Sequence, residues 1–254
     1  MTVPIGVGAK AEGPVGHTYA VVLVGVTEGS DTRKELLACL REIRCSGWIA
    51  PAEDGWVPIV MAGAETVAAG RRGAVGVGEA VAGTLATTTL AVRVLEDRQL
   101  VVVAWESGRE VARYVSDPSR EPGAEEDVLP VPFGTEGAEA VAAACGRPEV
   151  AEELDELLGE SLDPDEDIES ERLGRVLRLL GLPAWLVTAW RLPRKMSAGP
   201  ALRELCRLGA GHTGPRGWLA GRAARLGRRW RRPPPVLLDP PKGDGGMDEM
   251  AMWL

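Results

Sequence analysis

The chain has 254 residues, a net charge of −8 and an apolar share of 45%, which is enough to bury a globular core. Its longest uncharged stretch, Gly13–Thr27, is shorter than the roughly 20 apolar residues of a membrane-spanning helix, so no segment qualifies as one. The four cysteines lack CxxC spacing and no signal peptide is recognised, so we expect reduced thiols and a cytoplasmic protein.

The N-terminal part of the chain is predicted to begin with a strand and a helix. Tyr19–Val26 is a continuous apolar run, as expected of a buried strand. Thr32 and Glu35 then form a capping-box pattern, and Leu36 and Leu40 recur at helical spacing. A helix is therefore expected directly after the first strand.

A second strand and a second helix follow. Gly55–Gly63 has strand character but contains Pro58, which predicts a position near a sheet edge because proline cannot donate a ladder hydrogen bond. Gly78–Thr89 is rich in small residues and is predicted to be helical.

Three strands in a meander are predicted next. Leu90–Glu96, Leu100–Glu106 and Glu110–Ser116 each alternate apolar side chains, and Ser107-Gly108 is a two-residue hairpin signal. The order β-α-β-α-β-β-β predicts an α+β fold, with a mixed or mainly antiparallel sheet and its two helices on one face.

Composition divides the chain further. Residues 1–116 are predicted to form the α+β domain, 117–137 a linker, 138–210 a helical segment, 211–232 a basic amphipathic arm and 233–254 a disordered tail.

The helical segment is predicted to contain five short helices. Gly181 and Pro183 end the third of them. The five are Ala138–Cys145, Pro148–Glu160, Ser170–Pro183, Ala184–Leu192 and Pro200–Gly209.

The loops lack recognisable ligand motifs. Gly25–Thr32 runs from a strand into a helix but lacks the spacing and the lysine of a phosphate-binding loop. Val75–Gly83 lacks the third glycine of a dinucleotide fingerprint and is expected to be a glycine-rich turn. Asp163–Asp167 resembles the start of a calcium loop, but Ile168 stands where glycine is required, so we expect a solvated acidic loop.

Catalytic chemistry has little support. The only two histidines, His17 and His212, are far apart in sequence and are expected to be exposed loop residues. Paired carboxylates stay open as a general possibility because the chain has 37 acidic residues. We predict no catalytic residue, cofactor or metal site.

One resemblance emerges from the meander and the helix after it. Gly108, Tyr114, Ser116 and Pro118 close the meander, and "ERLGRVLRLLGLPAW" follows later. This pattern resembles a group of uncharacterised actinobacterial proteins over Trp56–Trp190. Arginine outnumbers lysine 25 to 4, a bias typical of GC-rich bacteria such as actinomycetes. The shared motifs are structural, so the resemblance implies the domain fold and no activity, and the basic C-terminal extension departs from it.

Charge is unevenly distributed along the chain. Residues 1–171 hold 13 Lys and Arg against 32 Asp and Glu, whereas residues 172–254 hold 16 against 5. Such asymmetry indicates a partner for one half of the chain or contact between the halves.

The arm is predicted to be a basic amphipathic helix. At about 100° per residue, its apolar stripe falls between about 80° and 140° from Trp218, and its arginines fall between about 280° and 40°. Gly221 and Gly227 weaken such a helix by roughly 1 kcal/mol each. The predicted partner-binding residues are Trp218, Leu219, Arg222, Arg225, Leu226, Arg228, Arg229, Trp230 and Arg232.

Three interpretations of the arm compete. The stripe packs on the chain's own body, or the arm binds nucleic acid or an anionic membrane, or it docks an acidic protein surface. The acidic surface is the chain's own Glu152–Glu171 or another protein, and it accounts for both charge blocks. We therefore expect a non-enzymatic interaction or regulatory protein. The alternative is an enzyme or small-ligand-binding protein with a pocket between sheet and helices, near Trp56, Trp105 or Tyr114.

Overall fold

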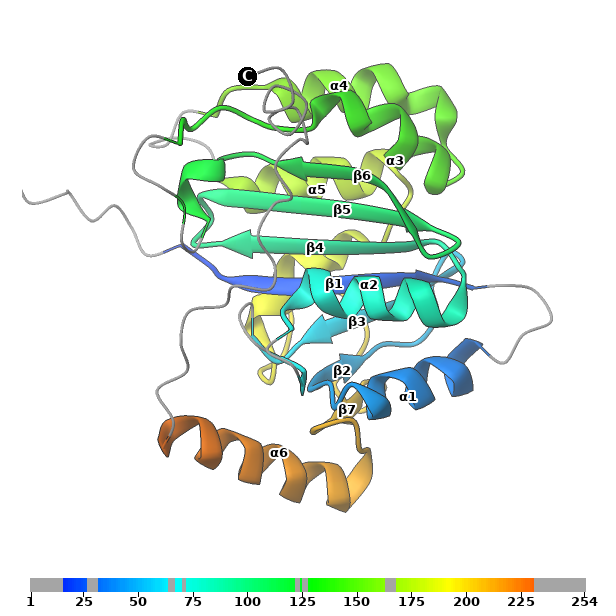
Figure 1. Ribbon diagram of the computed structural model, residues 1–254, viewed down its shortest axis with the longest axis vertical. Coiled ribbons are helices and arrows are strands. Elements are labelled where there is room, and N and C mark those ends of the chain that lie inside the picture. Colours follow the sequence, from blue (N-terminus) through cyan, green and yellow to red (C-terminus); the bar gives the residue numbers. More distant parts are fainter. Residues whose placement is uncertain are drawn as a thin grey trace, which may run out of the picture.

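One antiparallel sheet organises the molecule (Figure 1). The computed structural model describes residues 16–26, 32–63, 67–69, 72–121, 124, 128–162 and 168–230. Within them, seven strands lie in the order β6-β5-β4-β1-β3-β2-β7, and every paired neighbour is antiparallel. The α+β fold with a mainly antiparallel sheet is thereby confirmed. The strands are β1 (Tyr19–Gly25), β2 (Gly47–Ile49), β3 (Trp56–Met61), β4 (Thr89–Leu95), β5 (Gln99–Glu106), β6 (Arg109–Val115) and β7 (Cys206–Leu208).

The predicted meander forms strands β4, β5 and β6. The hairpin between β5 and β6 turns through Ser107 and Gly108, whose φ angles are 49° and 81°. Two consecutive residues with positive φ match the right-handed twist of the flanking strands, which is why a Ser-Gly pair suits this turn. The sequence signal for this hairpin is confirmed.

Helices cover both faces of the sheet: the two N-terminal helices share one face, as expected, and the helices of the later segment cover the other. Side chains of β1 alternate between two cores: Ala20 and Val22 lie in one, and Tyr19 and Val21 lie in the other. A strand buried on both faces reads as a continuous apolar run. The helices are α1 (Thr32–Glu42) and α2 (Ala74–Leu85) on one face, and α3 (Ala138–Ala144), α4 (Ala151–Gly159), α5 (Glu169–Leu179) and the 3₁₀ helix η5 (Ala184–Arg191) on the other.

The predicted position of the Pro58 strand near a sheet edge is wrong. Strand β3 lies between β1 and β2, with Pro58 opposite Leu23. In an antiparallel ladder both backbone groups of a residue face the same neighbour. The Pro58 carbonyl accepts from the Ala50 N–H at 2.9 Å, just beyond the end of β2. The position at which Pro58 lacks an N–H therefore lies opposite Ala50, one residue beyond the end of β2.

The predicted helix over Pro200–Gly209 is wrong, because this segment supplies the edge strand β7. Trp48 pairs with Arg207, and Gly47 pairs with Leu208. The short strand β2 links β7 to the rest of the sheet. A three-residue strand fixed by distant pairing leaves no local periodicity to detect.

The segment predicted as a linker is tied back to the sheet at several points. Phe133 pairs with Val115 at the end of β6, and the buried Arg93 forms an ion pair with Glu121. Short 3₁₀ helices, η2 (Pro118–Arg120) and η3 (Thr135–Gly137), flank the connection. A third, η4 (Pro148–Val150), precedes α4.

Helix α2 confirms the helix predicted from Gly78, although it ends at Leu85, and it replaces the glycine-rich turn expected over Val75–Gly83. A Cβ at Gly78 would lie 2.8 Å from the Trp105 ring, so glycine lets α2 pack closely on β5. No helix of the described residues is long and apolar enough to cross a membrane.

Candidate functional site

Helix α6 (Gly214–Trp230) lies beside the β7 edge of the sheet and is mounted there through its backbone (Figure 1). A Cβ at Gly217 would lie closer than 3.0 Å to the carbonyl oxygen of His212. A Cβ at Gly209 would meet the carbonyl of Gly217 and the nitrogen of Gly221 in the same way. The three glycines therefore bring the helix against the preceding loop with no side chain between them.

The loop before α6 is itself fixed to the body. The backbone N–H of Gly211 donates to the Cys45 carbonyl at 2.6 Å, and that of Ala210 donates to the Ser46 hydroxyl at 3.0 Å. Both bonds link the loop to the segment between α1 and β2. The start of the helix therefore has a fixed position on the sheet edge.

The large side chains of α6 point away from the body. Leu219 is 60% exposed, Leu226 50% and Trp218 48%. The described leucines of the predicted stripe, Leu219 and Leu226, therefore do not pack on the chain's own core. The Arg222 guanidinium lies 5.5 Å from the centre of the Trp218 ring, a cation–π contact on the arginine side of the helix. The free face of α6 thus presents leucine and arginine side by side.

The remaining predicted partner-binding residues are only partly described. Arg225, Arg228, Arg229 and Trp230 belong to the backbone of α6, but their side chains lie outside the described part of the chain. Arg232 and the tail predicted for 233–254 also lie outside it.

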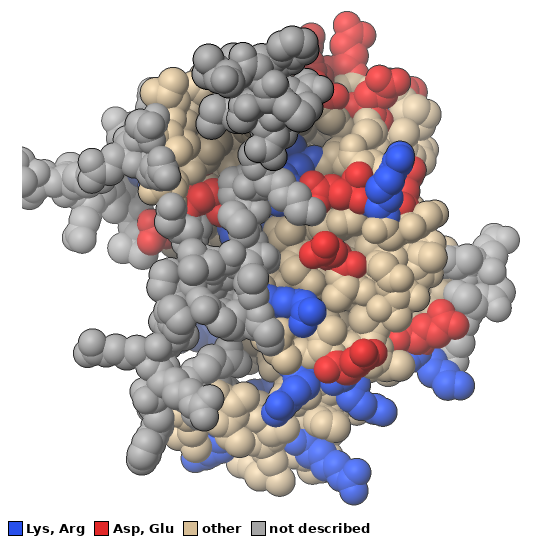
Figure 2. All heavy atoms as spheres, in the orientation of Figure 1, with Lys and Arg blue, Asp and Glu red and all other residues tan. Residues whose placement is uncertain are grey.

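The acidic and basic residues that are separated along the sequence are also separated in space. Figure 2 shows red spheres gathered over α4 at one end of the molecule, and blue spheres near α6 at the other. Helices α4 and α6 lie at opposite edges of the sheet, because α4 covers the β6 side and α6 contacts β7. In the described part of the chain, the α4 portion of the acidic block and the α6 portion of the arm therefore lie at opposite edges of the sheet.

The exposed face of α4 is acidic throughout. Its outward residues are charged, while Leu154, Leu157 and Leu158 face the core. No ion-pair partner appears for Glu153 or Glu156 among the described residues. The outward acidic residues of α4 are Glu152, Glu153, Asp155 and Glu156, and exposed Glu160 follows directly after the helix.

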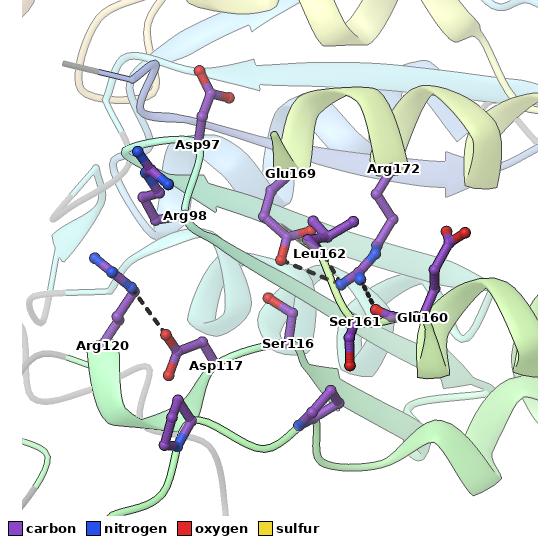
Figure 3. Close-up of a pocket in the computed structure, with 12 residues that line it drawn as sticks. Asp97, Arg98, Ser116, Asp117, Arg120, Glu160, Ser161, Leu162, Glu169 and Arg172 are labelled. Carbon is purple, nitrogen blue, oxygen red and sulfur yellow. Dashed lines mark hydrogen bonds and ion pairs between the residues drawn. The ribbon is translucent and has the colours of Figure 1, made fainter. Parts of the chain in front are cut away.

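A pocket of about 290 Å³ lies between the β4–β5 turn, the end of β6 and the start of α5 (Figure 3). Buried Glu169 and Arg172 reach into it from α5, and Ser116 reaches in from the end of β6. It adjoins Tyr114, whose hydroxyl accepts from Arg172 at 3.0 Å. Polar groups do converge beside Tyr114, as the small-ligand interpretation requires.

The charges of this pocket are engaged with one another. Arg172 pairs with Glu169 at 3.3 Å, and Arg120 pairs with Asp117 at 2.9 Å. Asp97 accepts from the His17 backbone N–H at 2.6 Å. Burial raises the pKa of the Glu169 carboxyl, because desolvation outweighs the attraction of Arg172. The network joins α5 to the sheet, while the buried Nε of Arg172 has no hydrogen-bond partner among the described residues.

The sequence analysis did not predict this buried network of Arg172, Glu169 and Tyr114. One signal was present: Arg172 falls on the same face of the predicted helix as Leu173 and Val176. A charged residue on an apolar helix face needs a buried partner. Glu169, three residues earlier, is that partner.

The two histidines lie apart in the structure as well. His17 is half-buried and stacks on Trp190, with ring centroids 3.5 Å apart, whereas His212 is exposed in the loop before α6. The expectation that His17 is exposed is therefore wrong, because Trp190 covers one side of its ring.

The residues that the structure describes contain no group of three or more His, Cys, Asp or Glu side chains placed to hold a metal ion. The acidic loop Asp163–Asp167 lies outside them, as does most of Gly25–Thr32.

Comparisons with protein-family models, curated proteins and solved structures found no match to this chain.

Proposed function

We propose that this chain is a non-enzymatic interaction protein that docks an acidic protein surface through helix α6. One observation carries the proposal: three large apolar side chains, Trp218, Leu219 and Leu226, are 48–60% exposed on a helix that also carries Arg222. Exposed apolar groups clustered beside charged ones are typical of a protein interaction site.

The spacing of the apolar residues suits a groove in a partner. Leu219, Ala223, Leu226 and Trp230 stand at positions i, i+4, i+7 and i+11, the pattern of a helix that lies in an apolar groove. The stripe is narrow and bordered by arginines, because Arg216 and Arg222 lie three residues before and three residues after Leu219. A partner with a narrow groove and an acidic rim therefore complements it better than the broad apolar layer of a membrane does.

The close backbone contacts of the glycines that hold α6 support the same function. Because Gly209, Gly217 and Gly221 fix the helix through its backbone, its side chains remain available for a partner. A presented helix loses less conformational freedom on binding than one that must first fold. The acidic face of α4 lies at the other edge of the sheet, where it does not repel an acidic partner at α6.

The cytoplasm is the proposed location, because the four cysteines have no framework spacing. The small-ligand alternative has less support, because the charges of the pocket beside Tyr114 are engaged within the chain.

Photo-crosslinking tests the proposal directly. A benzophenone amino acid placed at Leu219 would be activated in cells that express the chain natively, and the crosslinked peptides would be identified by mass spectrometry. We expect adducts on peptides rich in Asp and Glu. The same probe at Leu202, which is 42% exposed but lies outside α6, is the matched control and should give none of them.

Charge reversal completes the test. Arg222→Glu in the chain that carries the probe should abolish the acidic adducts, because it places a carboxylate where a guanidinium stood. Adducts on lipid or nucleic acid, or protein adducts that survive Arg222→Glu, would contradict the proposal.

A further inference from the structure

A pocket of about 280 Å³ lies where the end of helix α1 approaches the start of helix α6 (Figure 1). The described residues that line it are Arg41, His212, Thr213 and Arg216. None of them is acidic, and Glu42, which follows Arg41 in the chain, is not among them. The pocket therefore offers two guanidinium groups, an imidazole and a hydroxyl, all of which can donate hydrogen bonds.

Backbone contacts bring the walls of this pocket together. A Cβ at Gly211 would lie 2.5 Å from the Cα of Arg41, so the loop before α6 packs directly on the last turn of α1. The same loop is closed by two backbone hydrogen bonds, because Gly209 and His212 each donate to the carbonyl of the other, at 2.9 and 3.1 Å. Both walls of the pocket therefore have a fixed backbone.

The two arginines of the pocket lack a counter-charge. Within the described part of the chain, neither Arg41 nor Arg216 forms an ion pair. The exposed Arg175, by contrast, pairs with Glu160 at 2.6 Å. Two positive charges thus line one pocket, and an anion from outside the molecule would neutralise them.

The start of α6 adds to the same positive potential. Its first turn contains Arg216 and no acidic residue. A helix start carries a partial positive charge and backbone N–H groups without partners in the helix, so it favours an anion and disfavours a cation. The position of Arg216 therefore opposes the helix dipole, and an anion bound in the pocket would be attracted by both.

We propose that this pocket binds the phosphate group of a phosphate monoester. A monoester carries a charge of about −1.5 to −2 at pH 7 and three strong acceptor oxygens, which suits two guanidinium groups and a helix start better than a singly charged carboxylate does. Arginine side chains and helix starts are both established phosphate ligands in proteins. Since a water molecule takes up about 30 Å³ in the liquid, the pocket also has room for part of the group that the phosphate esterifies.

The phosphate has two possible sources, and the pocket recognises what they share. Arg216 lies three residues before the exposed Leu219, so the two side chains are neighbours on α6. A phosphorylated side chain of an acidic partner docked on α6 would reach the pocket, and so would a free small phosphate monoester. Binding of the phosphate itself does not depend on the function proposed for α6.

NMR titration with methyl phosphate tests the proposal. The backbone amides of Thr213, Gly214 and Arg216, and the side-chain Nε–H signals of both arginines, should shift and saturate at millimolar ligand, with ionic strength held constant by sodium chloride. Arg41→Gln or Arg216→Gln should weaken binding about tenfold, because each removes charge-assisted hydrogen bonds. The double variant should abolish saturation.

A matched control separates the pocket from general charge effects. Arg33→Gln with Arg194→Gln removes the same charge from exposed positions that do not line the pocket. This control should bind methyl phosphate as the wild type does. Shifts that never saturate, or an equal loss of binding in the control, would overturn the inference.

The source of the phosphate follows from a comparison of free phosphoserine with an acidic peptide that carries one phosphoserine. A peptide that binds at least about tenfold more tightly, as expected of two linked contacts, and that also shifts the amides of Leu219 and Arg222 places the phosphate on a docked partner. A smaller difference places it on a small molecule. Methyl phosphate and crosslinking at Leu219 are separate measurements, so the pocket and the proposed function fail independently.

Discussion

Helices α5 and α6 have similar amino-acid compositions but pack against the sheet in different ways. Both carry several arginines and leucines. Helix α5 buries Leu173 and Leu177 to 1% exposure and draws Arg172 to 3%. Helix α6 keeps Leu219 and Leu226 half-exposed or more, and Arg222 is exposed too.

The difference comes from what each helix places against the sheet. Helix α5 packs with side chains, so its leucines join the core and its one inward arginine needs the Glu169 partner. Helix α6 packs through the backbone of its glycines, so its leucines stay exposed to solvent. An amphipathic pattern therefore shows which residues share a face, and the glycines decide whether that face is buried.

The largest expected contrast is between two arginines. Arg172→Met removes the guanidinium beside buried Glu169 and should lower the free energy of unfolding by about 3–5 kcal/mol. Arg222→Met on the exposed face of α6 should cost less than about 1 kcal/mol. Urea denaturation measures both, and equal losses would erase the distinction between the helices.

The leucines should differ almost as much. Leu177→Ala leaves a cavity in the core and should cost about 2–5 kcal/mol. Leu226→Ala, with the same change of side chain on an exposed surface, should stay within about 0.5 kcal/mol. Chemical denaturation of the two variants under one condition compares them, and a loss above about 2 kcal/mol for Leu226→Ala would show that its side chain is buried in solution.

The close contact of Gly217 with the preceding loop predicts an effect confined to α6. Gly217→Val forces a side chain into the carbonyl of His212, so α6 must move off the loop, at a cost of about 1–3 kcal/mol. Hydrogen exchange should accelerate in amides 214–224. Ala223→Val, on the exposed side of the same helix, is the control and should leave exchange unchanged. Equal protection in both variants would argue against backbone packing.

The smallest effect depends on pH. Burial raises the pKa of Glu169 above its ordinary value of 4.5, so the folded protein holds this proton more tightly than the unfolded chain does. The stabilisation from this proton is present at low pH and is lost as the pH rises through the raised pKa. Glu169→Gln removes the titration.

The stability of the wild type relative to Glu169→Gln should therefore fall between about pH 4 and pH 7. Unfolding curves of both proteins across that range measure the difference. A difference that rises with pH would mean that Arg172 dominates and that the pKa of Glu169 is lowered instead.

Local signals predicted much of the fold. Ser107-Gly108 needs only two residues to specify its turn, and the stripe of α5 repeats within its own helix. The interior place of β3 and the existence of β7 depend on pairing with residues far away in sequence. No local pattern contains that information.

The candidate site divides in the same way. The apolar stripe of α6 follows from helical spacing, so its members could be read from the sequence. Its exposure could not, because the sequence presents Gly221 only as a weak point of a helix and gives Gly217 no particular role. Their close approach to Gly209 becomes visible only in three dimensions.

The ¹⁹F resonance of Trp218 tests the central claim, that α6 presents its free face to an acidic surface, most directly. With 5-fluorotryptophan in all eight tryptophan positions, Trp218→Phe assigns the signal, and buried Trp105 serves as the internal reference. At low protein concentration Trp218 should respond to solvent, and Trp105 should not. Adding poly-glutamate at low salt should shift and broaden Trp218 and leave Trp105 unchanged, and about 1 M salt should reverse the change. A Trp218 signal that is shielded from solvent, or that responds to neither poly-glutamate nor salt, would contradict the account.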